Sequence, residues 1–193
     1  MHIPDGYLDL RICIIFYILS GIFILIAIRK IRLHEESIPL YISMVAIIFA
    51  AQMLDWPIPG GTTAHFTGGA LAGIILGPWG GTLVMTIVLA IQAIIFGDGG
   101  VLTLGANIWN MGVIAPFTGY TLYTLFRRYG YTASIAGAFI GGWLSSIIAS
   151  LFAGLQLGLS TIFLYPITVT IPVMILYHLG FGLIDGVVCG GVV

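Results

Sequence analysis

The chain has 193 residues, of which 60% are hydrophobic and only 7% are charged, and its formal net charge is -1. Soluble domains carry roughly 25% charged residues, so this composition excludes an ordinary soluble domain and indicates an integral membrane protein. The near-zero net charge also excludes the strongly basic surface that is typical of nucleic-acid-binding proteins.

Long apolar runs predict an all-α membrane protein with about seven transmembrane helices in a single domain, residues 1–193, because a bilayer core requires about 20 apolar helical residues. In chain order, the expected helices cover about residues 8–28, 38–54, 68–76, 81–96, 106–126, 133–153 and 162–188. The third helix is short and crosses only about half of the hydrocarbon core at 1.5 Å per residue. The loop before it is therefore expected to dip inward, which membrane proteins tolerate where the backbone is buried in protein or lines a wet cavity.

Basic residues predict the orientation of these helices. Two clusters, at residues 29–32 and 127–128, contain most of them, and the positive-inside rule places both in the cytoplasm. The N-terminus, the loop 55–67 and the loop 96–100 are then expected on the outer face and the C-terminus on the inner face. The first apolar run lacks the pattern of a cleaved signal peptide, since its main basic cluster follows it, so Met1 is expected to remain.

Met1 and His2 form the first candidate metal site. The terminal amine, the deprotonated backbone nitrogen of His2 and its Nδ1 can close two fused chelate rings around one divalent metal. Such planar nitrogen coordination suits Ni(II) and Cu(II) and can take Co(II), whereas zinc prefers a tetrahedron. A solvated terminus is the commoner state of a histidine beside an initiator methionine. Asp5 and Asp9 are expected to be solvated or to attract cations, and neither is needed as a ligand.

A second candidate ligand, His65, lies in the outer loop DWPIPGGTTAHFTGG. Pro57 and Pro59 restrict the backbone of this loop and the following glycines permit tight turns, so the loop is expected to hold a defined shape. His65 is well placed to supply the fourth nitrogen that Met1 and His2 leave open. A hydrogen-bonded structural histidine is the alternative, and the predicted position on the same face as His2 favours the ligand.

Further polar residues are candidates for supporting roles. Asp98, Asn107 and Asn110 could orient the ligand imidazoles, and a turn with helix-packing amides is an equal alternative. His178 and Asp185 fall in the last helix, where they could face a cavity or form a structural contact between helices. The sequence does not decide between these roles.

The sequence lacks several common functional motifs, which limits the classes of function to consider. The chain has no GxGxxG or GxxxxGK[ST] phosphate-binding loop and no HExxH zinc motif. An intramembrane metalloenzyme is disfavoured because four protein nitrogens leave no open position for a substrate. A self-sufficient secondary transporter or channel is the other alternative, but neither a coupling-ion site nor repeated halves are evident.

Four stretches, MHIPDGYL, IPGGTTAHFTGGALAGIILGPW, FGDGGVLTLGANIWNMG and HLGFGLIDG, together resemble the CbiM/NikM family. These proteins are the substrate-binding S components of cobalt and nickel energy-coupling factor (ECF) transporters, and the resemblance covers nearly the whole chain. It implies a seven-helix protein in a prokaryotic cell membrane, with an extracytoplasmic N-terminus. It also implies that Co(II) or Ni(II) is a transported substrate, held by the Met1 amine, the His2 backbone nitrogen and imidazole, and the His65 imidazole, with no cofactor.

The resemblance also implies partners. In the family, the S component works with a transmembrane coupling protein and cytoplasmic ATPases, and some systems add a small membrane subunit. This chain departs from the family at Asp185, where glutamate is common, and it stops at Val193 where relatives often continue. Nickel and cobalt are not separated by the sequence, since both accept these donors.

Overall fold

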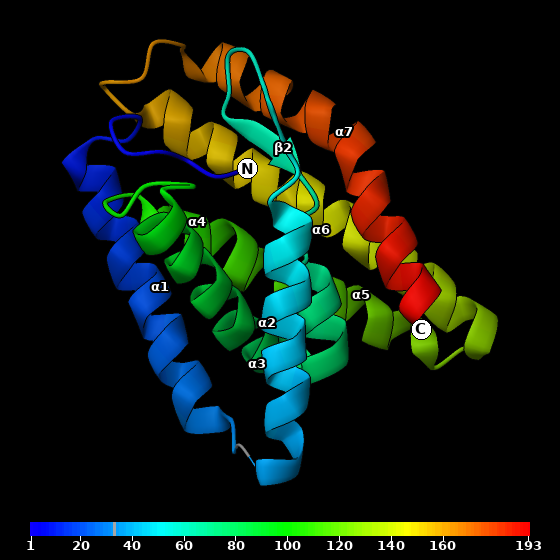
Figure 1. Cartoon of the computed structure of the whole chain (residues 1–193). Coiled ribbons are helices and arrows are strands. Elements are labelled where there is room, and N and C mark those ends of the chain that lie inside the picture. Colours follow the sequence, from blue (N-terminus) through cyan, green and yellow to red (C-terminus); the bar gives the residue numbers. More distant parts are fainter. Residues whose placement is uncertain (33) are drawn as a thin grey trace.

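The computed structural model describes residues 1–32 and 34–193 and shows a mostly helical protein (Figure 1). The α-helices are α1 (Leu10–Lys30), α2 (Ile38–Gln52), α3 (Gly69–Ile91), α4 (Leu104–Asn107), α5 (Ala115–Arg127), α6 (Tyr131–Leu159) and α7 (Ile167–Val192). Among the described residues, four segments are long and apolar enough to cross a membrane: Leu10–Lys30, Gly69–Phe96, Tyr131–Leu159 and Ile167–Val192. The chain is therefore a multi-pass membrane protein.

Helix α1 begins and ends where its charged residues predict. The Oδ1 atom of Asp9 accepts hydrogen bonds from the backbone N–H groups of Arg11 (3.1 Å) and Ile12 (3.2 Å) and so caps the first turn. Arg29 and Lys30 lie in the last turn, where basic side chains interact favourably with the helix dipole. A 3-10 turn, Glu35–Ser37, then leads into α2.

Helix α3 is bent back on itself at Gly77. This residue has non-helical dihedral angles, φ 77° and ψ 163°, and is followed by Pro78. A Cβ at Gly81 would lie only 2.8 Å from the backbone nitrogen of Gly73, so the two arms pack side by side. The turn expected at residues 77–80 is thus confirmed. A π-helical segment, Gln92–Phe96, ends the second arm.

One predicted helix is confirmed with an irregular middle, and one predicted boundary is wrong. The helix expected over residues 106–126 is present as a continuous helical stretch made of α4, a π-helical segment (Ile108–Ile114) and α5, and Pro116, which has no N–H, lies at the start of α5. The helix expected from residue 162 begins at Ile167, after Pro166 in extended backbone.

Glycine residues lie where the helices approach one another most closely. A Cβ at Gly73 would lie 2.4 Å from the carbonyl oxygen of Pro116, at the contact between α3 and α5. Similarly, a Cβ at Gly142 of α6 would lie 2.5 Å from the carbonyl oxygen of Asp185 on α7. Because the obstructing atoms belong to backbone, the helices would have to move apart to accept a side chain. The backbones therefore depend on glycine for their approach.

Gly73→Ala is expected to destabilise the protein by about 1–3 kcal/mol, the usual cost of overpacking. The matched control is Gly21→Ala on α1, where a Cβ meets no atom within 4 Å, so the better helix former should stabilise by up to about 1 kcal/mol. Thermal unfolding in detergent measures both variants. Equal unfolding midpoints for the two would contradict the packing argument.

Candidate metal centre

The N-terminal segment is held against α4 by Ile3. The N–H of Ile3 donates to Asn107 Oδ1 (2.9 Å), and its carbonyl oxygen accepts from Asn107 Nδ2 (3.1 Å) and from the N–H of Gly100 (3.0 Å). Thr103 Oγ1 donates to the same carbonyl. These contacts join residues about a hundred positions apart in the sequence, so the terminus has a fixed position and is not a solvated tail.

Asp5 fixes the loop that follows α3. Its carboxylate accepts hydrogen bonds from three successive backbone N–H groups, those of Val101 (3.1 Å), Leu102 (2.8 Å) and Thr103 (3.2 Å). A Cβ at Gly100 would lie 2.0 Å from Asp5 Oδ1, so only glycine fits there. Asp5 therefore has a structural role, which the sequence analysis did not assign.

The loop carrying His65 is a β-hairpin. Strands β1 (Asp55–Pro57) and β2 (Thr63–His65) are antiparallel, and Asp55 pairs with His65. The N–H of Ile58 donates to the carbonyl of Thr62 (2.8 Å), and Gly60 adopts φ 79°, which favours glycine. The loop expected to hold a shape does so, although its strands were not predicted. In Figure 1 the N-terminus lies beside β2, between α1 and α7.

Two threonines of this hairpin bind the chain terminus. The Met1 amine donates to Thr63 Oγ1 (2.7 Å), and Thr62 Oγ1 donates to the carbonyl of His2. Met1 and His2 are both buried. The amine is thus brought to the strand that ends in His65.

The imidazoles of His2 and His65 lie against each other. Their ring centroids are 4.5 Å apart and their planes differ by 22°. His65 Nδ1 lies 2.7 Å from the carbonyl oxygen of Phe66, which can only accept, so Nδ1 carries the proton and Nε2 carries the lone pair. His65 Nε2 is buried and has no hydrogen-bond partner among the described residues. This nitrogen is available to a metal.

The electrostatics of this cluster favour neutral donors. Burial lowers the pKa of the Met1 amine well below its ordinary 8.0, and the nearby carboxylates of Asp55, Asp98 and Asp185 oppose the shift only partly. Burial, followed by the charge of the amine, also lowers the pKa values of His2 and His65 well below 6.5. These shifts favour the deprotonated forms of all three groups, which are the forms that bind metals.

Of the three predicted supporting residues, Asp98 and Asn107 lie at the site and Asn110 does not. Asp98 Oδ2 is 3.7 Å from His2 Nε2, on the side of the ring opposite to the proposed Nδ1 donor position. Burial raises the pKa of Asp98. Asn107 supports the N-terminal backbone and not an imidazole. Asn110 exchanges two hydrogen bonds with Gln156 (2.7 and 3.0 Å), so of the two alternatives for Asn110 helix packing applies and orientation of an imidazole does not.

Asp185 has a role that the sequence left open. One of its oxygens accepts from Thr67 Oγ1 (2.6 Å), from the N–H of Thr67 (3.1 Å) and from the N–H of Gly68 (3.1 Å). These groups connect His65 to the start of α3. The carboxylate thus forms a clamp between α7 and the end of the hairpin. Of the two roles that the sequence allowed, the structural contact is the one observed.

His178 is the other residue whose role the sequence left open, and it is buried on α7.

Among the described residues, no three His, Cys, Asp or Glu side chains converge on a common metal position. Besides the two imidazoles, the terminal amine and the backbone nitrogen of His2 are candidate donors in this cluster.

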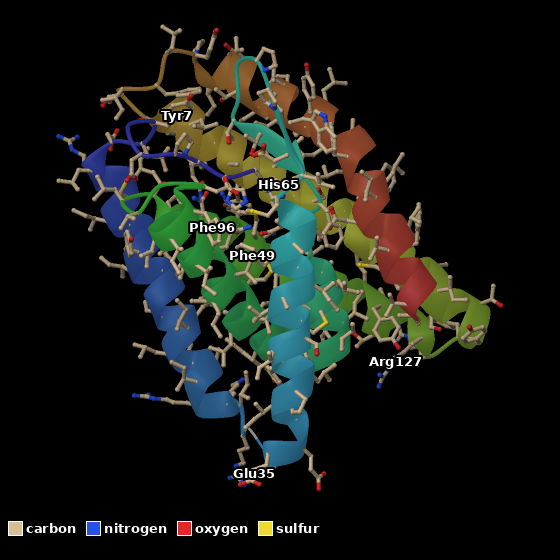
Figure 2. The ribbon with its side chains drawn as sticks, viewed as in Figure 1. Tyr7, Glu35, Phe49, His65, Phe96 and Arg127 are labelled. Atoms are coloured by element: carbon tan, nitrogen blue, oxygen red, sulfur yellow. The ribbon has the colours of Figure 1, made fainter. Side chains whose placement is uncertain are left out.

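In Figure 2, Tyr7 and His65 lie at one end of the molecule, and Glu35 and Arg127 lie at the other. The hairpin and the chain terminus therefore share an end that is remote from both basic clusters.

Comparisons with known proteins identify the family. The family model of CbiM, described as the cobalt uptake substrate-specific transmembrane region, matches residues 2–193. The crystal structure of a truncated transition metal transporter aligns with a TM-score of 0.95 at 36% identity, covering 100% of this chain and 96% of that one.

Individual relatives indicate the same family as the family model. A protein of Archaeoglobus fulgidus is 50% identical over 193 residues, which is 100% of this chain and 64% of that protein. The fused nickel transport protein NikMN of Rhodobacter capsulatus is 34% identical over 100% of this chain and 60% of its own length. The cobalt transport protein CbiM of Sorangium cellulosum is 36% identical over 83% of this chain and 74% of its own length. The chain spans less than two thirds of the first two relatives. It belongs to the CbiM family of cobalt and nickel transmembrane transport proteins, which is not a family of enzymes.

Proposed function

We propose that this protein is the S component of an ECF transporter and captures Ni(II) or Co(II) at the extracytoplasmic face. The transported ion is held by four nitrogens: the Met1 amine, the His2 backbone nitrogen, His2 Nδ1 and His65 Nε2. The observation that carries the proposal is the buried, unpartnered Nε2 of His65 beside the imidazole of His2. Asp98 Oδ2, 3.7 Å from His2 Nε2, is the nearby carboxylate that could accept a hydrogen bond from Nε2–H when Nδ1 is bound to the metal.

The proposed topology has seven crossings: α1, α2, the two arms of α3, the segment α4–α5, α6 and α7. The basic clusters 29–32 and 127–128 face the cytoplasm by the positive-inside rule. The N-terminus, the hairpin and Asp98 then face outward and the C-terminus faces inward. A transmembrane coupling protein and cytoplasmic ATPases, with a small membrane subunit in some systems, supply the energy for uptake.

Metal competition on the purified protein with its native N-terminus tests the site. One Ni(II) or Co(II) ion per chain is expected to bind more tightly than Zn(II), since the donor set is planar. Bound Ni(II) is expected to be diamagnetic, as four planar nitrogens require. A paramagnetic, six-coordinate nickel ion would contradict the four-nitrogen site.

Uptake assays test the transport role. Membranes that contain this chain together with the coupling protein and ATPases are expected to accumulate Ni(II) or Co(II) only when ATP is supplied. Uptake by the chain alone, without ATPases, would instead favour a self-sufficient transporter.

Proton release on binding is expected to be small because of the lowered pKa values. The lowered pKa values favour the neutral forms of the Met1 amine and of both imidazoles in the folded protein, so the release at pH 7 is expected to approach the single proton of the His2 amide, about one per metal ion. An exposed terminal chelate, with an amine pKa near 8, would release about two. As the pH falls through the lowered pKa values, protons compete with the metal and the affinity decreases. Calorimetry in buffers of different ionisation enthalpy counts the protons, and a release of two at pH 7 would contradict the prediction.

A further inference from the structure

His178 has a nitrogen that the proposed four-donor site does not use. Its Nδ1 lies 2.8 Å from the carbonyl oxygen of Met174, so Nδ1 carries the proton and Nε2 carries a lone pair. The side chain is fully buried, and Nε2 has no hydrogen-bond partner among the described residues. His65 has the same arrangement, with Nδ1 bonded to a carbonyl and Nε2 left free.

A buried nitrogen lone pair without a hydrogen-bond donor, such as that of His178 Nε2, destabilises the folded protein and is expected only where the nitrogen has a function. Leaving such a group without a partner costs about 1–3 kcal/mol, a penalty that leucine or phenylalanine at the same position would avoid. The bond to Met174 already fixes the ring, so structural needs do not account for the second nitrogen. An imidazole lone pair is a good donor to nickel and cobalt.

His178 lies on the helix that packs against the hairpin of His65. Helix α7 contacts β2, the strand that ends in His65. Met174, one turn nearer the start of α7, has its Sδ atom 2.7 Å from the position of a Cβ at Gly61 in the hairpin. His178 is one turn further along the helix, and Asp185 lies beyond it on the same buried face.

Release from a buried four-nitrogen site needs an incoming donor. A planar complex has two open faces, and ligand exchange there proceeds by attack of a fifth ligand before an existing bond breaks. We propose that His178 Nε2 is this ligand and receives the ion as it leaves the outer site toward the cytoplasm. In the exchange, one metal bond to His178 Nε2 forms and the metal bond to His65 Nε2 breaks. Both imidazoles stay neutral with their Nδ1 protons, and the metal keeps its charge.

This inference rests on the proposed function, and the test separates the two. Two donor-free variants, His178→Phe and His178→Leu, are compared with His178→Met, which keeps a donor atom, and with Thr170→Val, which removes a buried hydroxyl two turns away on α7. Each is measured as purified protein for Ni(II) affinity and in the full transporter for ATP-driven uptake.

Donor-free variants that fold are expected to keep the Ni(II) affinity and the KM of uptake, while the maximal rate falls at least about tenfold. His178→Met should recover part of the rate, and Thr170→Val should behave as the parent. Unchanged uptake in a folded donor-free variant overturns the inference, and so does loss of Ni(II) binding in both, because His178 would then serve the outer site. Failure of the parent transporter to take up Ni(II) overturns the proposed function instead.

Discussion

Acetylation of the Met1 amine is expected to lower the affinity for Ni(II) by at least about 100-fold. Four-ligand sites in small zinc proteins bind with about 10–16 kcal/mol, so one ligand contributes roughly 3 kcal/mol, which is about a 100-fold change in Kd. The acetyl group converts the amine into an amide and so removes its free lone pair from the five-membered chelate ring. It also adds atoms at a fully buried nitrogen that lies 2.7 Å from Thr63 Oγ1.

Variants of each histidine sharpen this test. His65→Ala and His2→Ala each remove one imidazole donor and are expected to weaken binding to a similar degree, with the helical content unchanged. His34→Ala is the matched control, since His34 is exposed at the remote end of the molecule beside Glu35. Parent-like affinity in the acetylated protein would show that the terminal amine is not a ligand.

Asp185→Ala is expected to weaken Ni(II) binding about 10–100-fold, the usual range when a group that orients a metal ligand is lost. The substitution leaves the N–H groups of Thr67 and Gly68 and the Thr67 hydroxyl without their acceptor. The segment that connects His65 to α3 then loses its contact with α7. Hydrogen bonds to a charged acceptor contribute about 1.5–3 kcal/mol, so the thermal stability should also fall.

Asp185→Asn is the matched control for this prediction. Asparagine has the same shape and keeps one acceptor oxygen, so Asp185→Asn should retain most of the affinity and stability that Asp185→Ala loses. Both variants are compared by metal titration and thermal unfolding. If Asp185→Ala bound Ni(II) as well as the parent, the clamp would have no part in positioning His65.

The hydrophobic runs predicted where most helices lie. The residues between the runs predicted where each helix begins and ends. The turn at Gly77 and the starts of α1 and α2 follow from such local signals. The π-type hydrogen bonding within the α4–α5 segment and the hairpin strands did not follow. A π-helical segment has the same composition as an α-helix, and strands of three residues are too short to show alternation.

The sequence predicted that His2 and His65 come together, but not which residues hold them there. Counting crossings placed His2 and His65 on one face, and the structure brings their rings into contact. The hydrogen bonds of Ile3 with Asn107 and of Asp185 with Thr67 join positions 104 and 118 residues apart. No local pattern specifies such pairs, since any amide or carboxylate in the helices is an equal candidate. The sequence left the role of Asn110 open for the same reason.

The clamp at Asp185 has a consequence for biosynthesis. The first residues to be made, Met1 and His2, lie against a hairpin whose far end is fixed by Asp185 of α7, 118 residues after Thr67. The hairpin therefore acquires this contact only after α7 has been synthesised and has packed against it. A chain that stops before α7 would contain the candidate donor atoms without the contact that fixes the segment after His65.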